Sequence, residues 1–208
     1  WRANAHSAGA YAIDNIETEP FGVFTNNVHG GAFRGYSSPQ LIYGQEQFID
    51  ECAAALGMRE TDFRRITCLK DGLSNATGTT LNSVTLSEVM EYTLAQTDYE
   101  NKRAEQAKQT SKEYRYGIGM AISHRSCGFG AEAPDASGAM LIANEDGSVY
   151  LNTGLAENGQ GLKTAYAMIV AESLGVCYEA VSFYGTNTHS IPDCGMTVAS
   201  RGTVMGAQ

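Results

Sequence analysis

The sequence predicts an α+β fold built from two subdomains, each with mixed short sheets and packed helices. Helical spacing of apolar residues dominates the first half of the chain, as in residues 40–56. Strand patterns on both sides of Asp146-Gly147, a hairpin turn signal, characterise the second half. Residues 98–112, charged and glutamine-rich, form either a solvated helix or a linker between these patterns. The predicted subdomains are therefore 1–112 and 113–208.

The first half contains helices joined by loops. Residues 1–12 are compatible with either a helix end or a strand. Pro39 suits the first turn of a helix, and Gly57 suits the position after its last turn. The expected elements are a short strand over 23–28, helices over about 40–56 and 61–68, and a helix that begins at a capping-box pattern formed by Thr85 and Glu88.

The second half contains the predicted strands. The expected elements are a strand over 114–123, a Gly/Ala loop over 127–138, a hairpin over 139–143 and 148–152, a helix over 162–174 followed by Gly175, a strand over 181–184 and a helix after 199–202. Two of the helices follow polar, glycine-containing segments. Because a helix N-terminus directs unpaired N–H groups at anions, these two segments are suited to converge on one anionic ligand.

Composition narrows the class of partner. Apolar residues make up 43% of the chain, as in ordinary globular proteins. A net charge of -9 with 14 Lys and Arg disfavours nucleic acid or an anionic membrane surface as a partner. The five scattered cysteines form no CxxC pair, which is typical of reduced thiols and a cytoplasmic location. Because the chain opens on Trp1 and its last helical pattern stops at Gln208, we expect a piece of a longer polypeptide.

Three motifs then carry a resemblance to a known family. They are GGAFRGYSSPQ at 30–40, ENGQG at 157–161 and ASRGT at 199–203. In order and spacing they resemble the molybdopterin-binding subunit of the xanthine oxidase, xanthine dehydrogenase and aldehyde oxidoreductase family. The resemblance runs along nearly the whole chain and covers a middle portion of the family's large molybdenum subunit.

The resemblance implies hydroxylation with water as the oxygen donor at a molybdenum centre held by a pterin cofactor, molybdopterin. The cofactor carries the difficult chemistry, while the protein binds, orients and polarises. The cytosine dinucleotide form of the cofactor is an alternative to the plain form. Iron–sulfur clusters and FAD would lie in other parts or subunits. The expected partners are these subunits, the rest of the molybdenum subunit and a small-molecule substrate, with no nucleic acid and no membrane.

The resemblance also assigns cofactor-binding residues. They are Ala32, Phe33, Arg34, Asn158, Gly159, Gln160, Ala199, Ser200, Arg201 and Gly202. No protein atom is expected to ligate the metal directly, although Arg34, Gln160 and Ala199 would lie near it. Our hypothesis for Arg201 is that it pairs with the additional phosphate of the dinucleotide form, a natural partner for a guanidinium.

Substrate binding is assigned by the resemblance to Arg2, Tyr36, Phe129 and Gly130. Tyr36 and Phe129 would stack on a flat substrate, although both are also compatible with an ordinary core position. Arg34 is likewise compatible with a structural role, in which it holds its own loop by hydrogen bonds to carbonyls. No catalytic residue is expected in the chain. The resemblance implies a general-base glutamate outside these 208 residues, and Glu157 does not match it.

The leading function is therefore oxidation of a purine or similar N-heterocycle, a role in purine metabolism, by an enzyme of which this chain is an incomplete and separately inactive fragment. The alternatives within the family are aldehyde oxidation and a reductive branch acting on an aromatic acyl-CoA. Outside it, the loops are compatible with a non-catalytic module that binds a nucleotide or phosphate, or with turns in a scaffold for other subunits.

Overall fold

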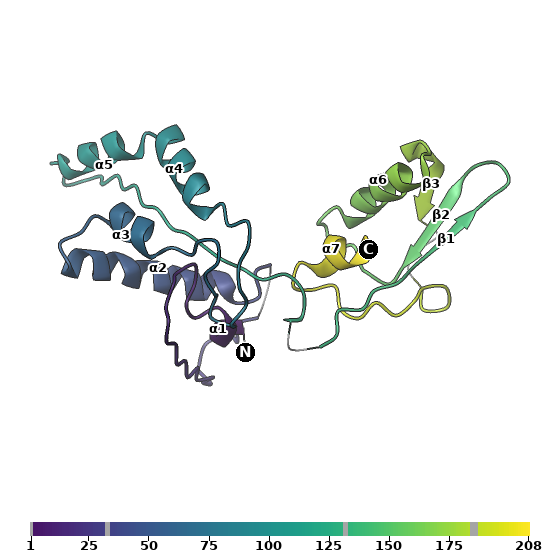
Figure 1. The fold of residues 1–208 in the computed structure, drawn as a ribbon, viewed down its shortest axis with the longest axis horizontal. Helices are drawn as coiled ribbons and strands as arrows, with labels where there is room; N and C mark the ends of the chain where they lie inside the picture. Colours follow the sequence, from purple (N-terminus) through teal and green to yellow (C-terminus); the bar gives the residue numbers. More distant parts are fainter. Residues whose placement is uncertain (1, 32–33, 131–132, 184–186) are drawn as a thin grey trace. The chain divides into compact units, whose positions relative to one another are not determined.

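The computed structural model describes residues 2–31, 34–130, 133–183 and 187–208, with the side chain of Arg2 outside this description. The chain forms two compact units, Trp1–Arg125 and Ser126–Gln208 (Figure 1). Each unit has its own hydrophobic core. In the described residues, no helix is both long and apolar enough to cross a membrane.

The first unit is helical. Its elements are α1 (Arg2–Ala5), α2 (Ser38–Ala55), α3 (Glu60–Thr67), α4 (Leu86–Gln96) and α5 (Tyr99–Ala107). Pro39 occupies the first turn of α2, and Gly57 after its end has a φ of 64°, as the sequence predicted. Thr85 is the N-cap residue of α4 but makes no side-chain capping hydrogen bond, so the predicted capping box is wrong.

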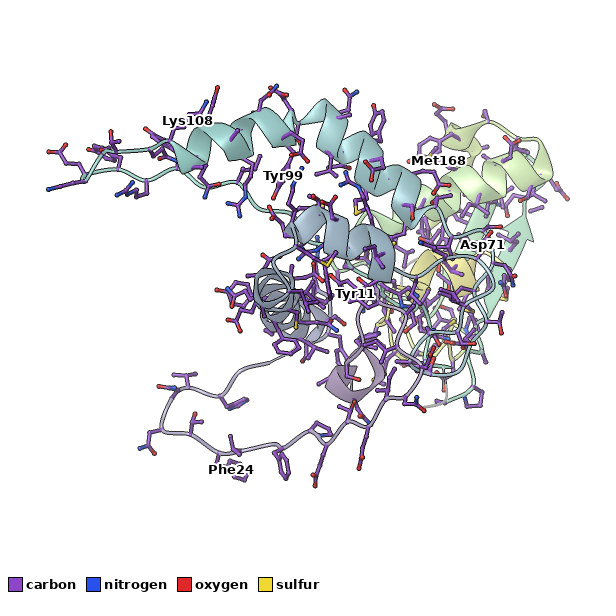
Figure 2. The ribbon with its side chains drawn as sticks, turned by 60° about the vertical axis from the view of Figure 1, so that its left-hand side comes forward. Tyr11, Phe24, Asp71, Tyr99, Lys108 and Met168 are labelled. Carbon is purple, nitrogen blue, oxygen red and sulfur yellow. The ribbon has the colours of Figure 1, made fainter. Side chains whose placement is uncertain are left out.

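An ion pair lies inside this unit. The Arg64 side chain has no solvent exposure, and its Nη2 lies 2.9 Å from Oε2 of Glu46, whose side chain is 7% exposed. Oε1 of Glu46 accepts the hydroxyl of Tyr11 at 2.5 Å. Arg64 Nη1 also donates to Oδ1 of Asp50 at 2.6 Å. The pair therefore ties α3 and the N-terminal segment to α2. Figure 2 shows Tyr11 beside these helices.

Residues 113–125 are extended but form no strand, so the strand predicted over 114–123 is wrong. Side chains satisfy the backbone in place of a neighbouring strand. Gln109 accepts the N–H of Tyr116 at 2.8 Å and donates to its carbonyl at 2.7 Å. Oε2 of Glu46 accepts the N–H of Ile122 at 2.9 Å. The segment therefore belongs to the first unit, and the units divide at 125/126, whereas the predicted subdomain boundary lies near 112.

Residues 12–31 form an extended loop. Phe24, Val28 and Phe21 have exposed fractions of 107%, 97% and 78%, and Figure 2 shows Phe24 on the outer part of this loop. No strand forms over 23–28, so that prediction is also wrong. The burial pattern explains why no strand forms. Both faces of this stretch stay exposed, so its apolar side chains are not stabilised by packing against a neighbouring element.

The second unit combines a sheet with helices, which confirms the α+β class for the chain. Its elements are β1 (Ala139–Ala143), β2 (Val149–Thr153), α6 (Leu162–Leu174), η2 (Tyr178–Ala180), β3 (Val181–Phe183) and α7 (Arg201–Gly206). The sheet order is β1-β2-β3, with β1 antiparallel and β3 parallel to β2. Residues 144–147 form the predicted hairpin turn, and Gly175 ends α6 with a φ of 68°. β2 and α6 supply most of the core.

Removing Glu46 tests how far the first unit depends on its buried ion pair. In Glu46→Ala, Arg64 loses its buried carboxylate and keeps only the half-exposed Asp50, and we expect the free energy of unfolding to fall by about 3–5 kcal/mol. Glu100→Ala is the control, because Glu100 pairs with Arg59 at the surface, where both side chains are about half exposed, and such pairs contribute about 0.2–1 kcal/mol. Chemical denaturation of both variants measures the difference. An equal decrease in the free energy of unfolding of both variants would contradict the stabilising role of the buried ion pair.

Candidate functional site

The FRGY motif forms a strained turn before α2. Ala32 and Phe33 lie outside the described residues. Arg34, Gly35, Tyr36 and Ser37 have φ values of 23°, 102°, 49° and 70°, a left-handed conformation that L-residues other than glycine rarely adopt. Four consecutive residues of this kind form a backbone that only its surroundings can hold in place. Arg34 is exposed, and so is Tyr36, with an exposed fraction of 45%.

Two contacts hold this turn. A Cβ on Gly35 would lie 2.6 Å from the ring of Pro39, so the close approach of the turn to α2 requires glycine. Ser38, the first residue of α2, is buried, and its hydroxyl lies 2.8 Å from Nδ1 of buried His6. The exposed residues Arg34 and Tyr36 are therefore anchored to the start of α2.

In the ENGQG motif, Glu157 caps α6. Its carboxylate accepts the N–H groups of Gly159 at 2.6 Å, Gly161 at 3.0 Å and Lys163 at 3.1 Å. The N–H groups of Gly161 and Lys163 hold the pKa of this carboxylate below its ordinary value. The negative charge also lies at the positive end of the helix. Glu157 therefore occupies the position that an anionic ligand of α6 would take. The sequence carried a signal for this role, an acid just before a helix.

Gln160 closes the same loop. Its Oε1 accepts the N–H of Asn158 at 2.5 Å, and its Nε2 donates to the carbonyl of Ala156 at 2.9 Å. Asn158, Gly159 and Gln160 are all exposed. The loop thus presents two side-chain amides on a backbone that internal hydrogen bonds have already shaped.

The two predicted loops of the second unit converge. The N–H of Ala156 donates to the hydroxyl of Thr197 at 2.7 Å, which links the ENGQG loop to the segment before α7. The hydroxyl of Tyr166, on α6, donates to the carbonyl of Gly202 at 2.6 Å. Burial raises the pKa of Tyr166 to about 12, so it remains a donor. A Cβ on Gly202 would meet Leu162 at 3.3 Å, which shows how closely α7 approaches α6.

Arg201 lies inside the second unit. Its side chain has no solvent exposure, and it donates to the carboxylate of Asp135 and to the carbonyls of Cys194, Met196 and Ala136. In this structure the guanidinium faces protein oxygens inside the unit, and its pairing with a cofactor phosphate stays a prediction. Asp135, which holds this arginine, was missed. Only its place as an acid in a Gly/Ala loop hinted at it.

The other residues predicted to bind substrate are Arg2, Phe129 and Gly130, and the last two differ in their exposure to solvent. Arg2 lies in α1, with its side chain outside the described residues. Phe129 is buried, with 8% exposed, and the Cζ of Arg201 lies 4.5 Å from its ring centroid. Gly130 is exposed, with a φ of 62°. These roles stay predictions.

The second unit has surfaces that fit a large, flat, polar ligand such as a pterin. A Cβ placed on Gly130 or Gly161 would meet nothing within 4 Å, so both loops border open space. Amide groups of Asn158 and Gln160 provide donors and acceptors there. In the described parts of the chain, no group of three or more His, Cys, Asp and Glu could hold a metal ion.

Two family models match the chain. Both are described as a molybdopterin cofactor-binding domain, one over residues 1–68 and the other over 92–208. A probable xanthine dehydrogenase subunit of Bacillus subtilis is 31% identical over 213 residues, covering 96% of this chain and 26% of that protein. An aldehyde oxidoreductase of Megalodesulfovibrio gigas is 31% identical over 198 residues, covering 94% and 21%. The chain spans about a quarter of the length of these relatives or less.

Solved structures show the same similarity. The aldehyde oxidoreductase from Desulfovibrio desulfuricans superimposes with a TM-score of 0.82 at 26% identity, covering 98% of this chain and 22% of that one. The enzyme from Desulfovibrio gigas gives a TM-score of 0.79 at 27% identity, covering 95% and 22%. The arrangement of elements described above is therefore shared with these proteins.

The capping role of Glu157 predicts a pH dependence. Its folded pKa lies below the unfolded value of about 4.3, so the ionised carboxylate stabilises the start of α6 above that pH. The stabilisation is lost as pH falls through the folded pKa. Hydrogen exchange at Gly159, Gly161 and Lys163, corrected for intrinsic rates, should therefore lose protection below about pH 4.3.

Glu157→Gln should abolish most of this dependence, since the amide does not titrate. Glu172→Gln, on the same helix but far from its N-terminus, is the matched control and should keep it. An unchanged pH profile in Glu157→Gln would rule out the capping role.

Proposed function

Because this chain belongs to the molybdopterin cofactor-binding domain family, we propose that it forms part of the cofactor site of a molybdenum hydroxylase, an oxidoreductase. The resemblance inferred from the three motifs is thereby confirmed. The complete enzyme would oxidise a purine or similar N-heterocycle with water as oxygen donor. The chain itself would be inactive, because the general base and the electron relay would lie outside it.

One observation carries the proposal. Seven residues other than glycine have positive φ in the described part of the chain, and five of them lie in the GGAFRGYSSPQ and ASRGT motifs. These are Arg34, Tyr36, Ser37, Ala199 and Ser200. Such conformations cost about 1–3 kcal/mol each and persist at functional sites, where the surrounding structure over-determines them. A scaffold for other subunits gives no reason to concentrate strain in these two motifs.

The residues of this chain would bind and orient the cofactor. Asn158 and Gln160 present amides in a loop shaped before any ligand arrives, so little ordering entropy is lost on binding. The backbone of 199–202 would approach the phosphate end. A bound molybdenum–pterin cofactor supplies the redox chemistry. Tyr36 offers a half-exposed ring that would stack on a flat substrate.

Aldehyde oxidation is the second candidate, favoured by the similarity to aldehyde oxidoreductases in both sequence and structure. A substrate screen on the intact enzyme, comparing N-heterocycles with aldehydes by kcat/KM, separates the two. Iron–sulfur and FAD subunits, a cytoplasmic location and either form of the cofactor belong to the same proposal.

Metal analysis of the intact complex tests the proposal directly. Protein purified with its natural subunits should contain molybdenum close to one atom per subunit, together with a pterin. Gln160→Ala removes two hydrogen bonds that shape the loop, each contributing about 1 kcal/mol, so cofactor retention should weaken by up to roughly thirtyfold. Gln96→Ala, at the exposed end of α4, is the control and should retain full content. Absence of molybdenum from the unaltered complex would instead favour a nucleotide-binding module.

The role of Tyr36 is tested by substrate kinetics. Tyr36→Ala removes a stacking surface that contributes about 0.5–1.5 kcal/mol, so KM for a planar heterocycle should rise roughly two- to twelvefold. Tyr36→Phe keeps the ring and should stay near the unaltered enzyme. If the two variants share the same KM, the ring does not bind substrate.

A further inference from the structure

We propose that Asp135 and Arg201 form a clamp that positions Phe129 together with segment 199–202. The inference rests on the proposed function, because it treats Phe129 as a substrate-binding ring and 199–202 as a cofactor-binding segment. Neither clamp residue need touch the cofactor or substrate. Both would act through the groups that they hold, and are therefore positioning residues.

The carboxylate of Asp135 joins two segments that are distant in sequence. Its Oδ2 accepts the backbone N–H of Phe129 at 2.7 Å, and its Oδ1 accepts Nε of Arg201 at 2.8 Å. The hydrogen bond from Arg201 is the main cause that holds the pKa of Asp135 below its ordinary value. Each oxygen thus serves one segment, and moving either segment would break a charge-assisted hydrogen bond.

Arg201 extends the clamp. Nη1 donates to the carbonyl of Cys194 at 2.6 Å and to that of Met196 at 3.1 Å, while Nη2 donates to the carbonyl of Ala136. With the bond to Asp135, the guanidinium makes four hydrogen bonds. The same plane lies against the ring of Phe129, with Cζ 4.5 Å from the centroid, a geometry in which the cation attracts the π face. The ring is therefore fixed by both its backbone and its face.

Segments 127–128 and 199–200 are also joined by direct hydrogen bonds. The N–H of Gly128 donates to the carbonyl of Ala199 at 2.9 Å, and Sγ of Cys127 donates to the carbonyl of Ser200 at 3.1 Å. Gly128 has a φ of 85°, and a Cβ there would lie 2.3 Å from Oδ2 of Asp135. Only glycine therefore lets the carboxylate approach this closely.

The clamp accounts for the strain in the ASRGT motif. Ala199 and Ser200 have φ values of 53° and 55°, and they stand directly before Arg201. The side chain of Arg201 donates four hydrogen bonds that fix the backbone at this point, and these bonds help to hold the strained conformation of Ala199 and Ser200. The clamp therefore holds the buried Phe129 ring and the strained segment 199–202 in one fixed arrangement.

The experiment uses the intact enzyme with its natural subunits. Asp135→Asn keeps the shape of the side chain but removes its charge, and Arg201→Lys keeps the charge but removes the fork of donors. Asp146→Asn is the matched control, because Asp146 accepts hydrogen bonds from Ser148 in the β1–β2 turn of the same unit. Hydrogen exchange over 126–136 and 194–204 is measured with KM and kcat for a planar heterocycle and a small aliphatic aldehyde.

We expect Asp135→Asn to speed exchange in both segments together by roughly ten- to a hundredfold, the effect of losing hydrogen bonds to a charged group. KM for the planar substrate should rise severalfold, while kcat for the small aldehyde stays close to that of the control. Exchange that changes in 126–136 alone, or KM equal to that of Asp146→Asn, would overturn the clamp. Should Asp135→Asn fail to fold, Arg201→Lys decides by the same readouts.

Failure of the proposed function gives a different result. An unaltered complex without molybdenum and without oxidase activity would reject the proposed function, yet coupled exchange of the two segments would still support the clamp. Molybdenum present with uncoupled exchange would reject the clamp and leave the proposed function standing.

Discussion

A guanidinium removed from water needs protein oxygens for its N–H donors, and in each compact unit of this chain a fully buried arginine meets this requirement. The side chains of Arg64 and Arg201 have no solvent exposure. An unpaired charge in such a place would be strongly destabilising. Their acceptors come from segments far apart in sequence, such as Glu46 for Arg64 and Asp135 for Arg201. Pairing the charge therefore determines where those segments lie in each unit.

The same requirement explains how strained motif backbones survive. Ala199 and Ser200 are held by the residue that follows them, whose donors are fixed to Asp135 and to three carbonyls. The turn at 34–37 precedes α2, and α2 carries Glu46, which pairs with the other buried arginine. Left-handed residues would relax if their neighbours could move. Rigid, buried polar networks beside the exposed loops prevent that, and a preorganised loop binds its ligand at lower entropic cost.

Sequence patterns predicted what depends on local spacing. The helices α2 and α6, the hairpin at 144–147 and the three motifs all follow from residues close together in the chain. The strand expected over 114–123 does not form, because Gln109 and the distant Glu46 satisfy its backbone. The buried pairing of Arg201 was not predicted for a similar reason, since its partner Asp135 lies 66 residues earlier. Hydrogen bonds and ion pairs between residues so far apart produce no periodic pattern in the sequence, so they cannot be predicted from it.

The ASRGT and ENGQG motifs divide their residues in a way that residue type alone conceals. The charged side chains bond to groups of the protein itself: half-buried Glu157 caps α6, and fully buried Arg201 binds four acceptors. Glycines, backbone and uncharged amides remain at the surface of the loops, as at Gly159 and Gln160. A charge turned outward would select ligands by electrostatics, whereas amides and backbone select by hydrogen-bond geometry and shape. In the proposed site, the charged residues that first suggest catalysis or phosphate binding would therefore support the loops, and the least conspicuous residues would form the binding surface.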